Sequence, residues 1–246
     1  MGRERIDRVL VARGLVPSRA RARALIEAGK VTVAGRAVTK VSDLVDPAAP
    51  VDVAPDHPYV SRGGLKLEGA LEDLGIDPRG AVVADIGAST GGFTDCLLRR
   101  GAQRSYALDV GHGQLHPSLA ADPRVISMEG VNARYVDATS LPELVDLLVV
   151  DASFISLTKL LPAMLQLMKP TARMLALVKP QFEVGPSEVG KRGVVTDDAL
   201  RALALTDVCA AAQALGLTTQ GHAESRLSGP EGNREIFVLF ARSQTA

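Results

Sequence analysis

Residues 82–94 read Val82-Val83-Ala84-Asp85-Ile86-Gly87-Ala88-Ser89-Thr90-Gly91-Gly92-Phe93-Thr94, an apolar segment that runs into a cluster of glycines. The apolar segment predicts a buried strand. The glycines allow the backbone to turn tightly and to approach a ligand closely. A helix is expected from Phe93 to Arg100, ended by Gly101. A strand, a glycine-rich loop and a helix in this order are typical of an open α/β sheet, which binds its ligand at the carboxyl ends of its strands.

Similar segments continue to the end of the chain. Further strands are predicted at 105–110, 125–128, 147–151 and 174–179. Helices are predicted at 157–168, with a kink at Pro162, and from a cap at Thr196 to about Leu215. Two final strands, 218–226 and 235–241, have no helix between them. The pattern predicts a doubly wound parallel sheet with a terminal antiparallel strand pair, an ending more typical of methyltransferases than of dehydrogenases.

The charge is distributed unevenly along the 246 residues. Residues 1–40 hold ten basic and three acidic side chains, a net charge of +7, whereas residues 41–246 hold eighteen basic and twenty-five acidic ones, a net charge of −7. A small basic unit is a candidate for binding a polyanion, although a solvated helical surface explains the charge equally well. Prolines indicate a linker near residues 54–61, and hence domains at 1–58 and 59–246.

The basic segment has the pattern of a small α+β unit. One helix is expected from Ile6 to a stop at Gly14, and a second from a cap at Ser18 to about Ala28. Residues 30–33 and 36–41 are expected to form a hairpin. Arginines crowd the second helix, and two of them, Arg19 and Arg23, share a face. Their repulsion is expected to lower helix stability unless phosphates neutralise it.

Several classes of protein are excluded by composition. No apolar run approaches the ~18 residues that a membrane-spanning helix needs, and the first residues are charged. The two cysteines, Cys96 and Cys209, have no partner at metal-ligand or redox spacing, so neither a disulfide framework nor a metal site is expected. These features predict a soluble, cytosolic protein.

The glycine-rich loop differs from a dinucleotide loop. Ser89 stands where the G-x-G-x-x-G pattern has its second glycine. Asp85 precedes the loop, where its charge would oppose a pyrophosphate but suits the ammonium group of S-adenosylmethionine. Asp109 ends the next strand and can accept hydrogen bonds from both ribose hydroxyls, although it is also an ordinary strand-end turn residue. Together these acids favour S-adenosylmethionine over NAD.

Two lysines and two carboxylates form a candidate catalytic set, Lys66, Asp151, Lys179 and Glu235. A ribose hydroxyl must lose its proton as it attacks a methyl donor, and a buried lysine near a second ammonium group can serve as the base. The structural alternatives are a solvated helix residue for Lys66, a helix cap for Asp151 and an edge-strand charge for Glu235. Amine methylation usually needs prolines that the segment 151–154 lacks, and neither cysteine is placed for base methylation at carbon.

The N-terminal segment resembles the small RNA-binding module named after a ribosomal small-subunit protein. The resemblance rests on Arg5-Ile6-Asp7, Ser18-Arg19 and Val33-Ala34-Gly35, with apolar and glycine positions between them. It implies docking on structured RNA by shape and phosphate contact. The RNA-binding candidates are Arg5, Arg19, Arg21, Arg23, Lys30 and, in the second domain, Arg62.

The whole chain resembles the TlyA-type ribosomal RNA 2′-O-methyltransferases, whose catalytic half is similar to the FtsJ-type ribose methyltransferases. Besides the glycine-rich loop, the similar segments are 59–66, 107–111, 151–156, 179–183 and 232–235. The resemblance implies a class I methyltransferase fold and methylation of a cytidine 2′-hydroxyl in large-subunit rRNA, in some members also in small-subunit rRNA. It carries the family's Lys-Asp-Lys-Glu tetrad over to Lys66, Asp151, Lys179 and Glu235. The implied donor-binding residues are Asp85, Gly87, Ala88, Ser89, Gly91, Gly92, Phe93, Thr94, Asp109 and Asn132.

One segment departs from the family pattern, since Glu129-Gly130-Val131-Asn132 stands where Glu-Arg-Thr-Asn is usual. Asn132 can still bind the adenine, whereas the arginine of the pattern has no counterpart here. Members are often named hemolysins, and without an apolar segment pore formation has no support. Two alternatives remain, a non-catalytic RNA-binding factor on the same scaffold and a nicotinamide oxidoreductase. The modified nucleotides and the oligomeric state are left open by the sequence.

Overall fold

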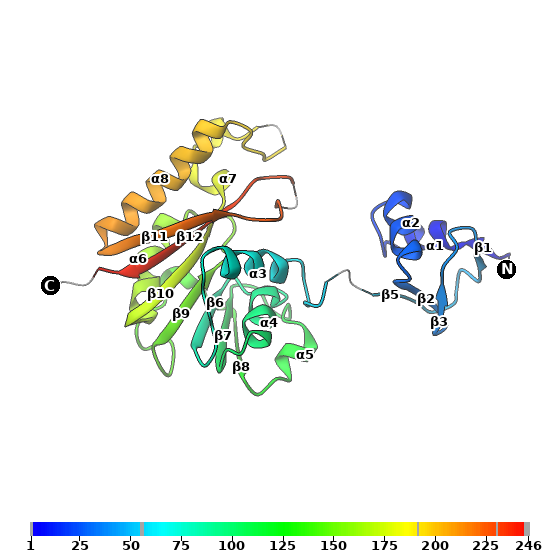
Figure 1. Cartoon of the computed structure of the whole chain (residues 1–246), viewed down its shortest axis with the longest axis horizontal. Helices are drawn as coiled ribbons and strands as arrows, with labels where there is room; N and C mark the ends of the chain where they lie inside the picture. Colours follow the sequence, from blue (N-terminus) through cyan, green and yellow to red (C-terminus); the bar gives the residue numbers. More distant parts are fainter. Residues whose placement is uncertain (1, 55–56, 191, 230, 244–246) are drawn as a thin grey trace. The chain divides into compact units, whose positions relative to one another are not determined.

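The chain forms two compact units, Met1–Pro58 and Tyr59–Ala246. Figure 1 shows a computed structural model, which describes residues 2–54, 57–190, 192–229 and 231–243. Residues 55 and 56 of the expected linker lie outside these described residues.

The N-terminal unit packs two helices against small antiparallel sheets. Its elements are β1 (Glu4–Arg5), α1 (Ile6–Ala12), α2 (Arg19–Glu27), β2 (Val31–Val33), β3 (Arg36–Val38), β4 (Leu44–Val45) and β5 (Val51–Val53). The predicted helices and hairpin are present, and Ser18 caps α2 by accepting a hydrogen bond from the Arg21 amide at 3.2 Å. Strand β5 pairs with β2 and extends the hairpin to a sheet of three strands, and β1 pairs with β4 in a separate sheet. The sequence pattern predicts neither of these two pairings. Ile6, Leu10 and Ile26 are fully buried in its core.

A seven-stranded sheet forms the centre of the C-terminal unit, in the order β11-β12-β10-β9-β6-β7-β8. Its strands are β6 (Val82–Ile86), β7 (Arg104–Asp109), β8 (Val125–Glu129), β9 (Val145–Val150), β10 (Met168–Val178), β11 (Leu217–Glu224) and β12 (Ile236–Arg242). The pairs among β6 to β10 are parallel, whereas β12 runs antiparallel to both of its neighbours. The strand order reverses between β6 and β9, and ligands of open α/β sheets bind at such a switch point.

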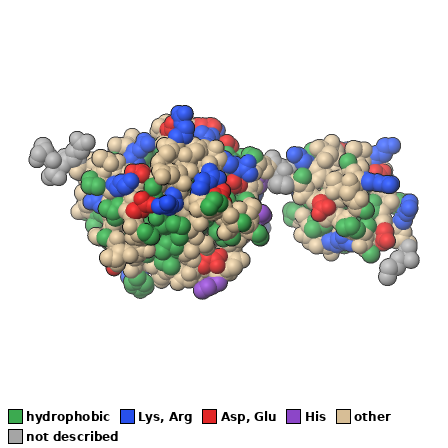
Figure 2. Space-filling model, turned by 90° about the horizontal axis from the view of Figure 1, so that it is seen from below, with side chains coloured by type: hydrophobic (Ala, Val, Ile, Leu, Met, Phe, Trp, Pro, Cys, Tyr) green, Lys and Arg blue, Asp and Glu red, His purple; other side chains and the backbone are tan. Residues whose placement is uncertain are grey.

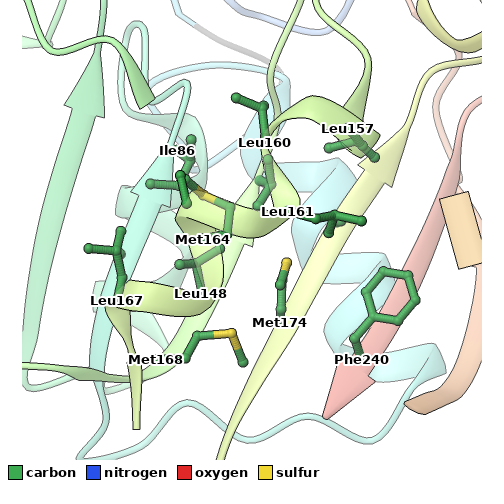
Figure 3. Close-up of a cluster of buried hydrophobic side chains, with 14 of the residues drawn as sticks. Ile86, Leu148, Leu157, Leu160, Leu161, Met164, Leu167, Met168, Met174 and Phe240 are labelled. Atoms are coloured by element: carbon green, nitrogen blue, oxygen red, sulfur yellow. The ribbon is translucent and has the colours of Figure 1, made fainter. Parts of the chain in front are cut away.

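Helices cover both faces of this sheet. The helical elements are α3 (Gly63–Asp73), α4 (Gly92–Arg99), α5 (Pro117–Ala120), η1 (Ala133–Tyr135), η2 (Leu157–Lys159), α6 (Leu161–Leu167), α7 (Pro180–Glu183), η3 (Pro186–Glu188) and α8 (Asp198–Ala214). On one face α3 and α4 pack on residues such as Val149 and Phe237. On the other, α6 and α8 share a core with Leu148 and Phe240, and Figure 3 shows α6 and its Met164 beside the sheet. The parallel strands are buried on both sides for this reason.

Two local predictions require correction, and one helix lies outside the predicted elements. The segment 157–168 is not one kinked helix, because the turn η2 is followed by the separate helix α6. Pro162 occupies the first turn of α6, where a missing amide hydrogen costs nothing. The cap of α8 is Asp197 rather than Thr196, since its Oδ1 accepts a hydrogen bond from the Ala199 amide at 2.7 Å. Helix α3 was not predicted as an element, although Lys66 lies on it.

Candidate active site

Four side chains of the predicted catalytic set line one cavity of about 380 Å³. Lys66 lies in the first turns of α3, Asp151 follows β9, Lys179 follows β10, and Glu235 precedes β12. The carboxyl ends of parallel strands meet at one edge of a sheet, so Asp151 and Lys179 come together there. Glu235 joins them because β12 runs in the opposite direction and begins at that same edge.

The four side chains are arranged as two ion pairs. The Lys66 Nζ lies 2.6 Å from Glu235 Oε2, and the two residues are only 9% and 2% exposed. The Lys179 Nζ lies 2.6 Å from Asp151 Oδ1, and Lys179 is 8% exposed. Each buried lysine therefore has a carboxylate that offsets much of the cost of its burial. The alternative of a solvated helix residue for Lys66 is wrong, because the side chain points into the protein and is paired there.

Lys179 has a second partner that the sequence analysis did not single out. Its Nζ donates a hydrogen bond to Ser153 Oγ at 2.8 Å. Asp151 Oδ1 has no aligned hydrogen bond among the described residues, so its contact with the amine is an ion pair. Only the position of Ser153 two residues after Asp151 could have indicated this contact.

Asp85 of β6 is a fully buried carboxyl at the floor of the cavity. Its Oδ2 accepts hydrogen bonds from the Thr94 amide at 2.9 Å and from Thr94 Oγ1 at 2.7 Å. Its Oδ1 has no hydrogen-bond partner among the described residues. Burial raises the pKa of Asp85 to about 7, the Thr94 bonds oppose this, and the nearby charges of Asp151 and Asp109 reinforce it. An unpartnered buried carboxyl oxygen fits an ammonium group of a ligand.

The glycine-rich loop passes close to the backbone of Asp151. Gly87 has a φ of +82°, and a Cβ built on it would lie 2.6 Å from the backbone oxygen of Asp151. Only glycine fits this conformation and this approach. The Ser89 amide donates to Asp109 Oδ2 and the Gly111 amide to Asp109 Oδ1, both at 2.8 Å. Asp109 therefore holds the loop against the end of β7.

The other loop residues fall into two groups. Ala88, Gly92 and Phe93 line the first cavity together with Gly87 and Ser89, and so does Thr90, which the sequence pattern does not single out. Gly91 and Thr94 do not line it. Thr94 acts through its hydrogen bonds to Asp85, and Gly91 is the residue before α4, with a φ of +91°.

A second cavity of about 490 Å³ adjoins the first and shares Gly87, Asp151 and Lys179 with it. Asp109 and Asn132 contribute polar groups to it, and most of the remaining lining side chains are apolar. Such a lining suits a flat aromatic ring with a few hydrogen-bonding groups. The Asn132 Oδ1 accepts a hydrogen bond from the Arg134 amide at 3.0 Å, which leaves its NH₂ group for a ligand.

The departure from the family pattern at Gly130 has a local structural cause. Gly130 has a φ of +73°, and a Cβ there would lie 2.7 Å from His112 Nε2. An arginine at this position would be strained in the present backbone. The glycine therefore fits its surroundings, and Asn132 keeps its place at the second cavity.

In the N-terminal unit the predicted RNA-binding arginines have acidic partners. Arg5 Nε and Arg19 NH2 lie 3.0 and 2.7 Å from the carboxylate of Asp7, which is 2% exposed. Arg23 pairs with Glu27 at 2.7 Å. Although burial opposes it, hydrogen bonds from Arg5 and Arg19 hold the pKa of Asp7 below its usual range. These ion pairs offset part of the repulsion that the sequence predicts among the arginines of α2.

The remaining candidates lie on both units. Arg21 and Lys30 belong to the N-terminal unit, where Figure 2 shows basic and acidic side chains side by side on the surface. Arg62 lines the first cavity, at the start of α3. Its segment is fixed to the C-terminal unit by a hydrogen bond from the Val60 amide to Asp95 Oδ2 at 2.8 Å.

Among the described residues, no group of three or more His, Cys, Asp or Glu side chains could hold a metal ion. Within the same ranges, none of the helices has the length and apolar character needed to cross a membrane.

Comparison with known proteins gives the family. Residues 59–242 match the FtsJ-like methyltransferase family, and residues 4–51 match the S4 domain. The chain belongs to the FtsJ-like methyltransferases. Its sheet accordingly has the class I methyltransferase architecture, and its cofactor is S-adenosylmethionine. The nicotinamide oxidoreductase and the non-catalytic factor are thereby set aside.

Relatives of this methyltransferase cover nearly the whole chain. The 16S/23S rRNA (cytidine-2′-O)-methyltransferase TlyA of Mycobacterium tuberculosis is 47% identical over 245 residues, which are 99% of this chain and 91% of the relative. Hemolysin A of Brachyspira hyodysenteriae is 38% identical over 96% of this chain and 99% of its own length. A solved structure of a hemolysin-named protein from Streptococcus thermophilus has a TM-score of 0.77 and 36% identity, and covers 100% of this chain and 90% of that one.

Proposed function

We propose that this methyltransferase modifies the 2′-hydroxyl of a cytidine in the ribosomal RNA of the large subunit, with the small subunit as the second candidate substrate. The observation that carries the proposal is the pair of buried lysine–carboxylate contacts in one cavity with the glycine-rich loop. The name of the relative from Mycobacterium tuberculosis supports the same substrate.

The residues of the first and second cavities fit S-adenosylmethionine. Asp85 offers an unpartnered carboxyl oxygen to the ammonium group of the donor. Asp109 and Asn132 would hold the ribose and the adenine in the second cavity. The other loop residues that line the first cavity would contact the rest of the donor, and they are Gly87, Ala88, Ser89, Thr90, Gly92 and Phe93. When bound, the cofactor supplies an electrophilic methyl group on its sulfonium.

Lys179 is proposed to accept, as a neutral amine, the proton of the ribose 2′-hydroxyl while that oxygen takes the methyl group from the sulfonium. The ammonium group that forms on Lys179 is then paired with the Asp151 carboxylate. The Lys179 amine is held between Asp151 Oδ1 and Ser153 Oγ, at 2.6 and 2.8 Å, so its direction is fixed before the substrate arrives. Lys66 adds a second amine at the same cavity, and Glu235 balances its charge. A base positioned in this way contributes typically 10²–10⁴-fold to a rate.

The N-terminal unit is proposed to bind structured rRNA through its phosphates. The basic residues proposed for this contact are Arg5, Arg19, Arg21, Arg23 and Lys30, with Arg62 at the first cavity. Asp7 and Glu27 hold three of these arginines in place, which orders them before RNA binds. Such a protein would work on ribosomal subunits in the cytoplasm.

The test is transfer of tritiated methyl groups from S-adenosylmethionine to purified ribosomal subunits from a strain that lacks this modification. We expect label in the large subunit, mapped to a cytidine ribose, and a second arm tests the small subunit. Label on a base, or none in either subunit although the protein binds S-adenosylhomocysteine, would refute the proposal.

A further inference from the structure

A third cavity of about 440 Å³ adjoins the first at Lys179. It shares Ser153, Lys179 and Glu235 with the first cavity, and none of the loop residues 85–94 line it. A ribose whose hydroxyl meets Lys179 would therefore lie where the first and third cavities meet. The aromatic rings of Phe154 and Phe182 form part of its wall.

Two side-chain amides line the third cavity, and they differ in their bonding. Asn233 is 3% exposed and uses both ends of its amide, since Oδ1 accepts from the Val195 amide at 3.0 Å and Nδ2 donates to Gly193 O at 2.8 Å. Gln181 has a buried Oε1 without a hydrogen-bond partner among the described residues. An unpartnered buried polar atom costs free energy, so it needs an explanation. Asn233 has a structural role, whereas the amide of Gln181 makes no hydrogen bond within the described part of the chain.

Gln181 is held on a rigid element directly beside the catalytic amine. It belongs to the short helix α7, whose first residue, Pro180, follows Lys179. Glu183 of the same helix accepts hydrogen bonds from Ser156 Oγ at 2.6 Å and from the Leu157 amide at 2.8 Å. The Phe182 ring lies 5.2 Å from the Phe154 ring, measured between centroids. These contacts fix the backbone of Gln181 relative to the loop that follows Asp151.

We propose that Gln181 binds the base of the nucleotide whose ribose is methylated, an inference that rests on the proposed function. The Watson–Crick edge of a pyrimidine presents hydrogen-bond donors and acceptors side by side, and a glutamine amide offers one group of each kind. A half-turn about the last side-chain bond exchanges the two ends of the amide, which lets it match the base. Enzymes that modify nucleotides commonly hold an unstacked base in such a pocket.

The test replaces Gln181 with methionine, which has a similar shape and no amide. We expect kcat/KM for ribosomal subunits to fall about ten-fold, the loss expected for one or two hydrogen bonds. The affinity for S-adenosylhomocysteine and the Tm of the protein should not change. Asn233→Ala should lower the Tm, because it removes two internal bonds. Gln213→Met, the same replacement at an exposed position of α8, should change nothing.

An unchanged kcat/KM in Gln181→Met would overturn the inference. A fall that is accompanied by a lower Tm or by weaker S-adenosylhomocysteine binding would also overturn it, because Gln181 would then have a structural or donor-binding role. If the wild-type protein methylates no ribosomal subunit, the proposed function fails instead, so the two failures are distinguishable.

Discussion

Lys66 and Glu235 are 169 positions apart in the chain and form a buried ion pair with 2.6 Å between Nζ and Oε2. The pair joins the first turns of α3 to the residue that precedes β12. It places one amine and one carboxylate of the proposed tetrad beside the pair formed by Lys179 and Asp151. The site therefore depends on contacts between segments that are distant in sequence.

Removal of Glu235 should destabilise the protein strongly. In Glu235→Ala the Lys66 ammonium would remain buried without a carboxylate, and breaking such a pair costs about 3–5 kcal/mol. Chemical denaturation of the C-terminal unit in the full chain measures the free energy of unfolding. Glu231→Ala, at an exposed position nearby, is the control and should be nearly neutral. Equal stability of the two variants would mean that water reaches Lys66 and solvates it.

Donor affinity should depend on pH through Asp85. Burial raises the pKa of Asp85 to about 7, so the carboxylate that attracts an ammonium group forms only as the pH rises through that value. We expect the affinity for S-adenosylhomocysteine, measured by calorimetry, to increase about ten-fold between pH 6 and pH 8. Asp85→Asn is the control, because any titration of the ligand itself affects both proteins equally. This variant should bind the ligand weakly and lack the increase. Identical pH profiles for the two proteins would contradict the role of Asp85.

The raised pKa of Asp85 should also make the stability of the ligand-free protein depend on pH. Because the folded pKa of Asp85 is raised above 3.8, its contribution to stability is present below pH 3.8 and is lost as the pH rises through about 7. Asp85→Asn should therefore gain Tm relative to the wild type as the pH rises over this range. Thermal unfolding followed at several pH values measures the difference, and a constant difference would speak against the burial of a titrating carboxyl.

Asp7 should stabilise the N-terminal unit more than Glu27 does. Asp7 is buried and holds two arginines, whereas the pair of Glu27 with Arg23 is exposed. We expect Asp7→Ala to cost about 1–2 kcal/mol and Glu27→Ala less than about 0.5 kcal/mol. Hydrogen exchange of α1 and α2 in the full chain reports the difference. Since the pKa of Asp7 is lowered from 3.8, its contribution should be present above that value and lost as the pH falls below it.

Deletion of residues 1–58 should reduce rRNA affinity and its dependence on salt more than donor affinity. Each phosphate contact releases counterions, so loss of the basic residues should flatten the plot of log affinity against log salt concentration. Filter binding of ribosomal subunits at several salt concentrations measures the slope, and calorimetry with S-adenosylhomocysteine confirms that the remaining protein is folded. An unchanged slope would mean that the basic residues form only a solvated surface.

The sequence predicts the parts of the site that depend on strand ends. Asp85, Asp151 and Lys179 each end an apolar strand, and parallel strands bring such residues to one edge without further information. The glycine-rich loop is predicted for the same reason, because Gly87 needs a backbone conformation that other residues avoid.

The parts that the sequence does not predict arise from packing between distant segments. The burial of Lys66 depends on its ion pair with Glu235, and Arg19 forms its ion pair with Asp7, which lies in another helix. The strands β1 and β4 have two residues each, too few to show the alternation of apolar and polar residues that predicts a strand. At α8 two adjacent residues are both good caps, and only the fold decides that Asp197 takes this position.

Lys179→Met is the most direct test of the proposal that Lys179 accepts the proton of the 2′-hydroxyl. Methyl transfer to ribosomal subunits is measured beside the affinity for S-adenosylhomocysteine, with Lys169→Met as the control. Lys169 is also a lysine paired with a carboxylate, Asp146 at 2.8 Å, but it lies at the start of β10, away from the catalytic edge. We expect Lys179→Met to lose at least about 100-fold in kcat while it binds the ligand within about two-fold of the wild type, and Lys169→Met to be unchanged. Retained turnover in Lys179→Met, or lost ligand binding in place of lost turnover, would contradict the account.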